Sequence, residues 1–318
     1  MSITEIIKNQ DFFKNIIEKH EKGLLLNALL FFCEDQETSK ATLVLTALML
    51  EYNVFELFNE NSAEYQRILS GVDLDIKVYP KNGEKLLVAD SNEIVSEAYI
   101  KPVNLKNKIF IINNFDVSTD EAQNKLLKVL EEPPKNVFFL ISAKSEERVL
   151  ATIKSRCEKI KIYPMDLQEL QNVSQNRLAV ILGGGFIGKT LMLEKNENLN
   201  AYADFIVSVF TKLKSSKEVI KYSKQFLEYK NNLKLLLQIF TLCIEDILKI
   251  KCESENLCSL NPYIVDLKDV EPEFSVEALC EISKLVCTLQ EKIEFNANLN
   301  IVIDNFLLKM LEVKFLCK

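Results

Sequence analysis

Four short apolar runs in the first half of the chain constrain the fold more than any other feature of the sequence. They occupy residues 24–33, 108–112, 137–142 and 159–163, and stretches with helical periodicity separate them. The segments IFII and VFFLIS are rich in β-branched and aromatic residues, which is typical of strands buried on both faces. Such strands alternating with helices predict a parallel sheet with crossover helices on both faces.

Two local patterns predict further elements between these runs. Ser118 and Glu121 have the spacing of a capping box, and an apolar stripe closed by a Pro-Pro pair follows them, so a helix is expected there. Residues 73–90 predict two strands joined by a turn at Asn82 and Gly83, because Asn-Gly favours tight hairpin turns. We expect this hairpin at the edge of the sheet.

The pattern changes after Pro164, where strand-like runs end and helical periodicity continues with one Gly-rich break at 183–188. We therefore predict an α/β domain over residues 1–164, a small helical domain over 165–212 and a larger all-helical domain over 213–318. The larger domain is expected to contain helices near residues 217–229, 231–253, 275–293 and 298–316.

Composition and charge argue against several classes of protein. The net charge of −7 is not that of a basic protein that coats nucleic acid, and seven Gly and seven Pro in 318 residues do not suit a turn-rich all-β fold. His20 is the only histidine, which leaves almost no basis for a histidine metal site or catalytic triad. No two of the eight cysteines form a CxxC pair, so we expect reduced thiols acting as small hydrophobic side chains and no zinc cluster.

Membrane segments are not expected. The N-terminal residues carry early charges and lack the apolar core of a signal peptide, and no apolar run reaches about 18 residues. Lys234, Glu245 and Asp246 interrupt the most apolar helical tract. The sequence therefore predicts a cytoplasmic protein.

The stretch GGGFIGKT, from Gly183 to Thr190, matches the phosphate-loop expression GxxxxGK[ST] in full. A phosphate loop needs a buried strand before it, so that backbone N–H groups at the next helix surround the phosphates. The preceding residues have helical spacing and polar content instead. We therefore favour a Gly-rich turn between two helices over a nucleotide site.

A phosphate loop belongs after the first apolar run, where the sequence has EDQETSKA. Lys40 occupies the lysine position, but Glu34 and Ser39 replace the glycines, and three nearby carboxylates would repel a triphosphate. Asn113 and Asn114 follow the next core strand, where magnesium-binding acids are expected. Lys40, Asn113 and Asn114 thus mark a degraded nucleotide site, and we predict neither a bound cofactor nor a metal. Asp116 is expected to cap the following turn.

Residues 109–157 resemble the bacterial clamp-loader subunits of DNA polymerase III. The resemblance rests on EAQNKLLK at 121–128, LEEPP at 130–134 and Ser155-Arg156-Cys157, in that order. It extends more weakly over residues 5–200, where GGFIGK at 184–189 stands at the second sensor turn of that family. It implies an α/β AAA+-type domain over 1–164, a helical lid over 165–212 and a helical collar over 213–318.

Within this family, the sequence is similar to the delta-prime class, which often has degraded nucleotide motifs and keeps the Ser-Arg-Cys motif. The resemblance implies that Arg156 is an arginine finger acting on ATP bound to a neighbouring motor subunit, with Ser155 and Cys157 flanking it. The alternative for Arg156 is a surface ion pair with Glu146, Glu147 or Glu158. Over residues 144–161, basic residues exceed acidic ones by three. This segment could bind an acidic partner surface, bind DNA phosphate, or simply face solvent.

The resemblance implies a stator-like subunit that has no ATPase activity of its own but belongs to the DNA polymerase III holoenzyme. Its expected partners are the gamma/tau motor subunits and the delta subunit in a pentameric ring, and indirectly the sliding clamp and primed DNA. Two alternatives remain open, namely an independent AAA+ ATPase that uses Lys40 and a purely structural scaffold in which Arg156 is idle.

Overall fold

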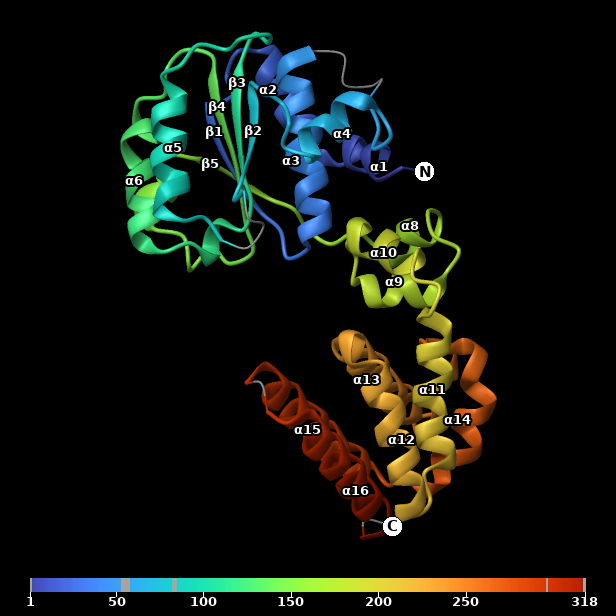
Figure 1. Cartoon of the computed structure of the whole chain (residues 1–318). Coiled ribbons are helices and arrows are strands. Elements are labelled where there is room, and N and C mark those ends of the chain that lie inside the picture. Colours follow the sequence, from blue (N-terminus) through green and yellow to red (C-terminus); the bar gives the residue numbers. More distant parts are fainter. Residues whose placement is uncertain (1, 53–57, 82–84, 296, 317–318) are drawn as a thin grey trace. The chain divides into compact units, whose positions relative to one another are not determined.

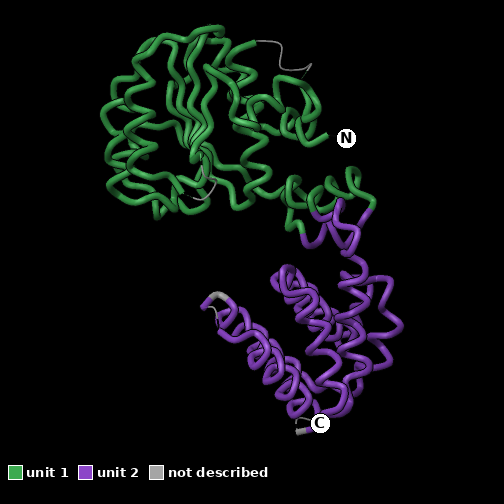
Figure 2. Tube along the Cα trace, viewed as in Figure 1, with its two compact units in different colours: residues 1–175, 183–192 green, residues 176–182, 193–318 purple. Residues whose placement is uncertain are grey.

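The computed structural model describes residues 2–52, 58–81, 85–295 and 297–316. These residues form two compact units, one comprising Met1–Gln175 and Gly183–Met192, the other Asn176–Leu182 and Leu193–Lys318 (Figure 2). Residues of the predicted small domain, 165–212, occur in both units, and the three-domain division stays a prediction. None of the described helices is both long and apolar enough to span a membrane.

The first unit contains a parallel sheet of five strands in the order β2-β3-β4-β1-β5 (Figure 1). Its register pairs Leu30 with Ile141 and Lys159, and Ile111 with Val78 and Leu140. The strands are β1 (Ala28–Phe32), β2 (Ile76–Tyr79), β3 (Lys108–Ile112), β4 (Val137–Ala143) and β5 (Glu158–Lys161). The predicted parallel sheet is therefore confirmed.

Helices cover both faces of this sheet, because alternate side chains of the strands point to opposite sides. Leu29 and Phe31 pack with one group of helices, whereas Leu30 and Phe32 pack with the other. The first group is α1 (Ile3–Asn9), α2 (Asp11–Glu21), α3 (Gln36–Tyr52) and α4 (Ala63–Leu69); the second is α5 (Val88–Ala98), α6 (Asp120–Glu131) and α7 (Ala151–Lys154).

The predicted hairpin over 73–90 is wrong. β2 lies at the edge of the sheet as expected, but it pairs in parallel with β3, and helix α5 begins at Val88 where the second strand was predicted. The backbone N–H of Leu87 donates to Asp90 Oδ2 at 2.9 Å, so the start of a helix forms there instead. The predicted turn at Asn82 and Gly83 lies outside the described residues.

The helix predicted after Ser118 begins one residue later than the capping box required. Thr119 is the N-cap of α6, and its Oγ1 accepts a hydrogen bond from Ala122 N at 3.3 Å. The Ser118 hydroxyl donates instead to the carbonyl oxygen of Phe115. The helix itself is confirmed.

After β5 the described part of the chain contains helices joined by turns and no further strand. Its helices are α8 (Leu167–Gln171), α9 (Arg177–Gly183), α10 (Ile187–Glu194), α11 (Leu199–Lys212), α12 (Ser216–Glu228), α13 (Leu233–Lys251), α14 (Ile264–Val270), α15 (Val276–Glu294) and α16 (Leu299–Leu316). Four of these lie where long helices were predicted. The core of the second unit includes Phe210, Phe240 and Phe306. The ring of Phe240 contacts those of both Phe210 and Phe306.

The cysteines follow the prediction only in part. All seven in the described residues are free thiols, and Cys33, Cys157, Cys243 and Cys258 are buried among apolar neighbours. Cys252, Cys280 and Cys287 are exposed, so they do not act as core side chains.

Candidate functional site

The loops that follow β1 and β3 meet at one edge of the sheet, because parallel strands end on the same side. The loop after β1 leads directly into α3, and Asn113 and Asn114 follow β3. Gln36 Nε2 donates to Asn114 Oδ1 at 2.8 Å and joins the two loops. Asn114 has a left-handed backbone with φ of 52°, which asparagine tolerates better than most residues.

The three residues of the predicted degraded nucleotide site lie together around a hollow of about 210 Å³. Lys40 Nζ is held by its neighbour Glu37, with 3.0 Å between Nζ and Oε1. Asn113 Oδ1 is buried and has no hydrogen-bond partner in the described part of the chain. The hollow is lined by Lys40, Val44, Leu69, Val78, Pro80, Ile111, Asn113 and Asn114. Among the described residues that line it, there is neither a carboxylate for magnesium nor a run of glycines for phosphate.

The N-terminus of α3, where a phosphate would bind, is occupied by the chain's own groups. Asp35 Oδ2 accepts hydrogen bonds from Thr38 N at 2.7 Å and from Lys189 N at 3.1 Å. Gly188 N donates to Thr38 Oγ1 at 2.9 Å, and a β-carbon on Gly188 would lie 2.3 Å from Thr38 N. A carboxylate therefore stands where the negative charge of a phosphate would be expected at a helix N-terminus.

The stretch from Gly183 to Thr190 contains the turn between α9, which ends at Gly183, and α10, which begins at Ile187, as the sequence favoured. A helix, and not a strand, precedes it. Gly185 has φ of +90°, and a β-carbon there would lie 2.4 Å from Pro164 Cβ, so glycine is required for this turn to pack on the chain after β5. The motif supplies backbone groups to α3 and does not form a phosphate loop.

Asp116 has a structural role, but its carboxylate binds a distant loop and not the following turn, which the sequence predicted it to cap. Its carboxylate accepts hydrogen bonds from Lys144 N at 3.1 Å and Ser145 N at 3.3 Å. It therefore fixes the loop that leaves β4 and leads towards Arg156.

Arg156 lies just after the short helix α7, and the structure gives its guanidinium two partners. Nη1 donates to Thr152 O at 2.9 Å, and Nη2 lies 3.1 Å from Glu131 Oε1 at the end of α6. Nε is buried and has no hydrogen-bond partner among the residues that the structure describes, while 29% of the side chain is exposed. The predicted ion pairs of Arg156 with Glu146, Glu147 or Glu158 do not form among the described residues.

Ser155 and Cys157 flank Arg156 in structural roles. Ser155 is the C-cap of α7, and its hydroxyl donates to Thr152 O at 3.0 Å. Cys157 is 7% exposed, and burial raises the pKa of its thiol to about 12, so it is not a reactive thiolate at neutral pH.

Gln123 is a positioning residue that the sequence argument did not find. It is fully buried on α6, where Nε2 donates to Arg148 O at 3.1 Å and Oε1 accepts from Leu150 N at 3.0 Å. The side chain thereby ties the segment before α7 to α6. The sequence did contain a signal for this role, because Gln123 lies between the apolar positions Ala122 and Leu126 of an amphipathic helix, and a buried amide needs hydrogen-bond partners.

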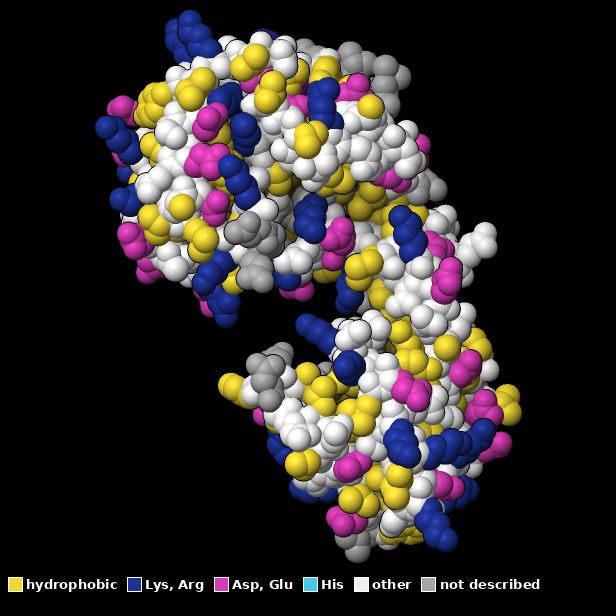
Figure 3. Space-filling view, viewed as in Figure 1, with side chains coloured by type: hydrophobic (Ala, Val, Ile, Leu, Met, Phe, Trp, Pro, Cys, Tyr) yellow, Lys and Arg dark blue, Asp and Glu magenta, His cyan; other side chains and the backbone are white. Residues whose placement is uncertain are grey.

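Several charged side chains over 144–161 are paired within the first unit, but the basic excess of three remains, because Glu146 is already counted in it and Lys19 from outside the segment pairs with Glu158. Glu146 pairs with Lys159 at 3.2 Å and Lys161 at 3.3 Å, and hydrogen bonds from these two lysines lower the pKa of Glu146. Lys154 Nζ donates to Glu146 O at 2.9 Å. Figure 3 likewise shows basic and acidic side chains interspersed on the visible face of this unit. Charges of both signs side by side suit a solvated face, and the acidic-partner and DNA-binding interpretations of the segment also stay predictions.

A family model described as DNA polymerase III, delta subunit, matches residues 8–166. The chain belongs to this family. The matched residues include every strand of the sheet together with Gln123, Glu131 and Arg156. The resemblance to clamp-loader subunits of DNA polymerase III is therefore confirmed.

Individual DNA polymerase III subunits are also similar to this chain in sequence. The delta′ subunit of Bacillus subtilis (strain 168) is 23% identical over 299 residues, which cover 88% of this chain and 89% of the relative. The delta′ subunit of Escherichia coli (strain K12) is 32% identical over 132 residues, 38% of this chain and 40% of that protein. The gamma subunit of Buchnera aphidicola subsp. Schizaphis graminum is 26% identical over 136 residues, and the match spans 37% of it.

A solved structure supports the fold. A gamma subunit-related protein of DNA polymerase III from Thermotoga maritima has a TM-score of 0.53, with 18% identity over 96% of this chain and 100% of that one. At this identity the similarity concerns the fold alone. It agrees with the parallel α/β domain followed by a helical region.

Proposed function

We propose that this chain is the delta-prime, stator-like subunit of a DNA polymerase III clamp loader. In this role it has no ATPase activity, supplies Arg156 to ATP on a neighbouring gamma/tau motor subunit, and helps to place the sliding clamp on primed DNA in the cytoplasm. The similarity to a delta′ subunit over 88% of the chain supports this assignment. The proposal includes a lid over 165–212 and a collar over 213–318 that joins the delta and motor subunits in a pentameric ring.

The proposal that this chain lacks ATPase activity rests on one observation. Asp35 caps α3 with its carboxylate and binds Lys189 N, so a nucleotide phosphate would have to displace a fixed negative charge. Lys40 is paired with Glu37, and the amides Asn113 and Asn114 replace the acids that would hold magnesium. Because ligand binding to the folded state raises the melting temperature, millimolar ATP with magnesium is expected to leave that of the isolated chain unchanged. A clear rise would favour an independent ATPase.

Arg156 has the chemistry that phosphoryl transfer requires. A planar guanidinium stabilises charge that develops on the γ-phosphate. Nη1 and Nη2 each carry a second N–H beyond the one used with Thr152 O or Glu131, and 29% of the side chain is exposed, which leaves donors for a phosphate oxygen. The segment that carries Arg156 is fixed by Gln123 and Asp116, which suits a group that must be held in place before it acts.

The assembly is tested by mixing this chain with the delta and motor subunits of the same organism and measuring mass by size-exclusion chromatography with light scattering. We expect a stable hetero-oligomer that contains this chain. Elution of this chain alone at micromolar concentration would contradict the proposal.

The finger is tested by the ATPase activity of the assembled complex. Arg156→Ala is expected to abolish turnover at the adjoining motor site, since arginine fingers contribute factors of about 10³ or more. Arg148→Ala is the matched control, because Arg148 is exposed on the same segment and carries the same charge. Equal activity of the two variants would favour a scaffold subunit in which Arg156 is idle.

A further inference from the structure

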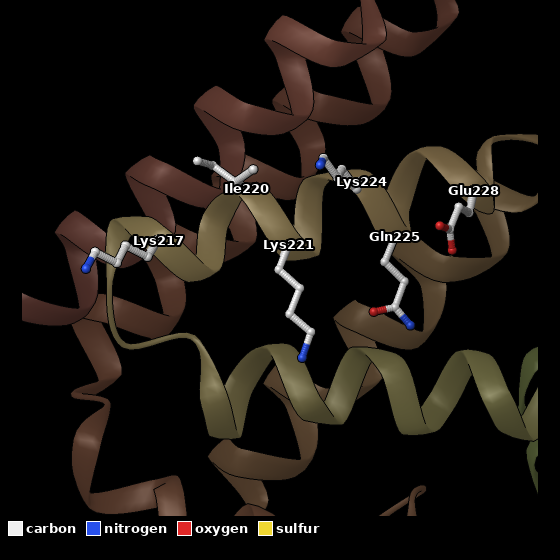
Figure 4. Close-up of a pocket in the computed structure, with 6 residues that line it drawn as sticks. All are labelled: Lys217, Ile220, Lys221, Lys224, Gln225 and Glu228. Atoms are coloured by element: carbon white, nitrogen blue, oxygen red, sulfur yellow. The ribbon is translucent and has the colours of Figure 1, made fainter.

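A basic face of α12 in the second unit is not explained by the nucleotide site or by Arg156. A shallow depression of about 510 Å³ lies along this helix. Figure 4 shows the side chains that line it, all of them projecting from α12. They are Lys217, Ile220, Lys221, Lys224, Gln225 and Glu228.

Positive charge is concentrated around this helix. Residues 212–234 contain seven lysines and two glutamates, whereas residues 235–316 contain seven lysines and fourteen acidic residues. Lys217, Lys221 and Lys224 recur at intervals of four and three residues, which places them on one side of a helix. None of the three forms an ion pair within the part of the chain that the structure describes.

The acidic residue nearest to this face in sequence is already engaged. Glu218 Oε2 accepts hydrogen bonds from Lys214 N at 2.6 Å and Ser215 N at 2.9 Å, in the capping box that begins α12. These bonds lower the pKa of Glu218 and hold its carboxylate at the helix end. Glu228 alone offsets the charge of the three lysines in the depression.

An apolar side chain lies among the lysines. Ile220 is 63% exposed, although the opposite side of α12 is well packed, with Val219, Tyr222 and Phe226 buried in the core of the second unit. Ile220 gives this charged face an exposed apolar side chain that a bound partner would cover. The described residues that line the depression include no aromatic ring and no arginine, the groups on which single-stranded nucleic acid stacks.

We propose that this face of α12 binds an acidic, amphipathic helix of another protein chain. Carboxylates at helical spacing on that helix would pair with Lys217, Lys221 and Lys224, and an aliphatic side chain would cover Ile220. The proposal does not depend on Arg156 or on the nucleotide site. Helix α12 lies within the proposed collar, but the test below uses this chain without other subunits, so its failure is distinguishable from failure of the clamp-loader assembly.

The test uses the full chain and a fluorescent synthetic peptide of about 18 residues with glutamate and leucine at helical spacing. We expect binding that weakens as salt is raised from low to moderate concentration, since the attraction is between exposed charges. Lys217→Glu/Lys221→Glu/Lys224→Glu is expected to weaken binding by about tenfold or more. Ile220→Ser is expected to weaken it by about fivefold, because an aliphatic contact is lost.

Matched controls separate this site from general electrostatics. Lys195→Glu/Lys292→Glu/Lys309→Glu makes the same charge change at exposed positions of the second unit and is expected to leave binding nearly unchanged. All substituted positions are exposed, so circular dichroism should show unchanged helicity for every variant.

Four results would overturn the proposal. In the first, the control triple variant loses as much binding as the Lys217/Lys221/Lys224 variant. In the second, a peptide whose leucines are replaced by serine binds as tightly as the original peptide. In the third, a single-stranded oligonucleotide binds as tightly as the peptide. The fourth is a dimer of this chain that the Lys217/Lys221/Lys224 variant dissociates, because the occupant would then be a second copy.

Discussion

Arg156 and Glu131 form an ion pair with 3.1 Å between Nη2 and Oε1, and this pair joins the two most specific motifs of the sequence. Glu131 belongs to LEEPP at the end of α6, and Arg156 to the Ser-Arg-Cys turn after α7. Thr152 O holds the other terminal nitrogen of the guanidinium. The orientation of Arg156 is therefore set by its own subunit before any partner binds.

Glu131→Gln is expected to lower the ATPase activity of the assembled complex by about two- to fivefold at the adjoining site, because the guanidinium loses its charged partner and is less well oriented. The effect should appear in kcat with KM for ATP unchanged, since Arg156 would act on the phosphoryl group in transfer. The free energy of unfolding should change by less than about 0.5 kcal/mol, because Glu131 is more than half exposed.

Glu132→Gln is the control for this prediction, since Glu132 is the exposed neighbour of Glu131 and forms no ion pair with Arg156. A Glu131→Gln complex as active as the Glu132→Gln complex would show that the pair has no part in orienting Arg156.

Strands were predictable from sequence because burial on both faces leaves a local signature, as in Lys108–Ile112 and Val137–Ala143. The error over 73–90 arose because Asn82 and Gly83 have strong turn chemistry, while the helical pattern beginning at Val88 is the signal that the structure follows.

The contacts of the site were less predictable, because they join residues far apart in the chain. The degraded motif around Lys40 was visible in the sequence, but nothing local indicated that Asp35 accepts a hydrogen bond from Lys189. The partner of Arg156 was sought among nearby acids for the same reason, and the fold supplies Glu131 instead.

Asp35→Ala is expected to destabilise the first unit by about 1–2 kcal/mol, because the N-terminus of α3 loses its cap and Lys189 N loses its acceptor. Urea denaturation followed by circular dichroism measures the change. Glu34→Ala is the control, since Glu34 is exposed and should change the free energy of unfolding little. Equal stability of the two variants would refute the capping role of Asp35.

Gln123→Ala should destabilise the first unit by about 1–3 kcal/mol, because Leu150 N and Arg148 O lose their partners near the core. It should also lower the ATPase activity of the assembled complex, since the segment leading to Arg156 is then less well fixed. Asn124→Ala, at the exposed neighbouring position of α6, provides the comparison. Stability and activity equal to those of Asn124→Ala would contradict the positioning role.

Asp75 gives the first unit a dependence on acid pH. Burial alone would raise the pKa of this carboxyl, but hydrogen bonds from the N–H groups of Val103, Asn104 and Leu105, together with the charge of Lys108, outweigh it and lower the pKa below 3.8. A group with a lower pKa in the folded state stabilises the fold above its unfolded value, and this contribution is lost as pH falls through the folded pKa.

The free energy of unfolding is therefore expected to fall below about pH 4 in the natural chain. Asp75→Asn should be less stable at pH 7 by about 2–3 kcal/mol, because the three N–H groups lose a charged acceptor, and its stability should depend less on pH in the acid range. Urea denaturation between pH 3 and about pH 7 measures both effects. Glu147→Gln, at an exposed position, should keep the natural pH dependence, and an Asp75→Asn profile parallel to it would refute the assignment to Asp75.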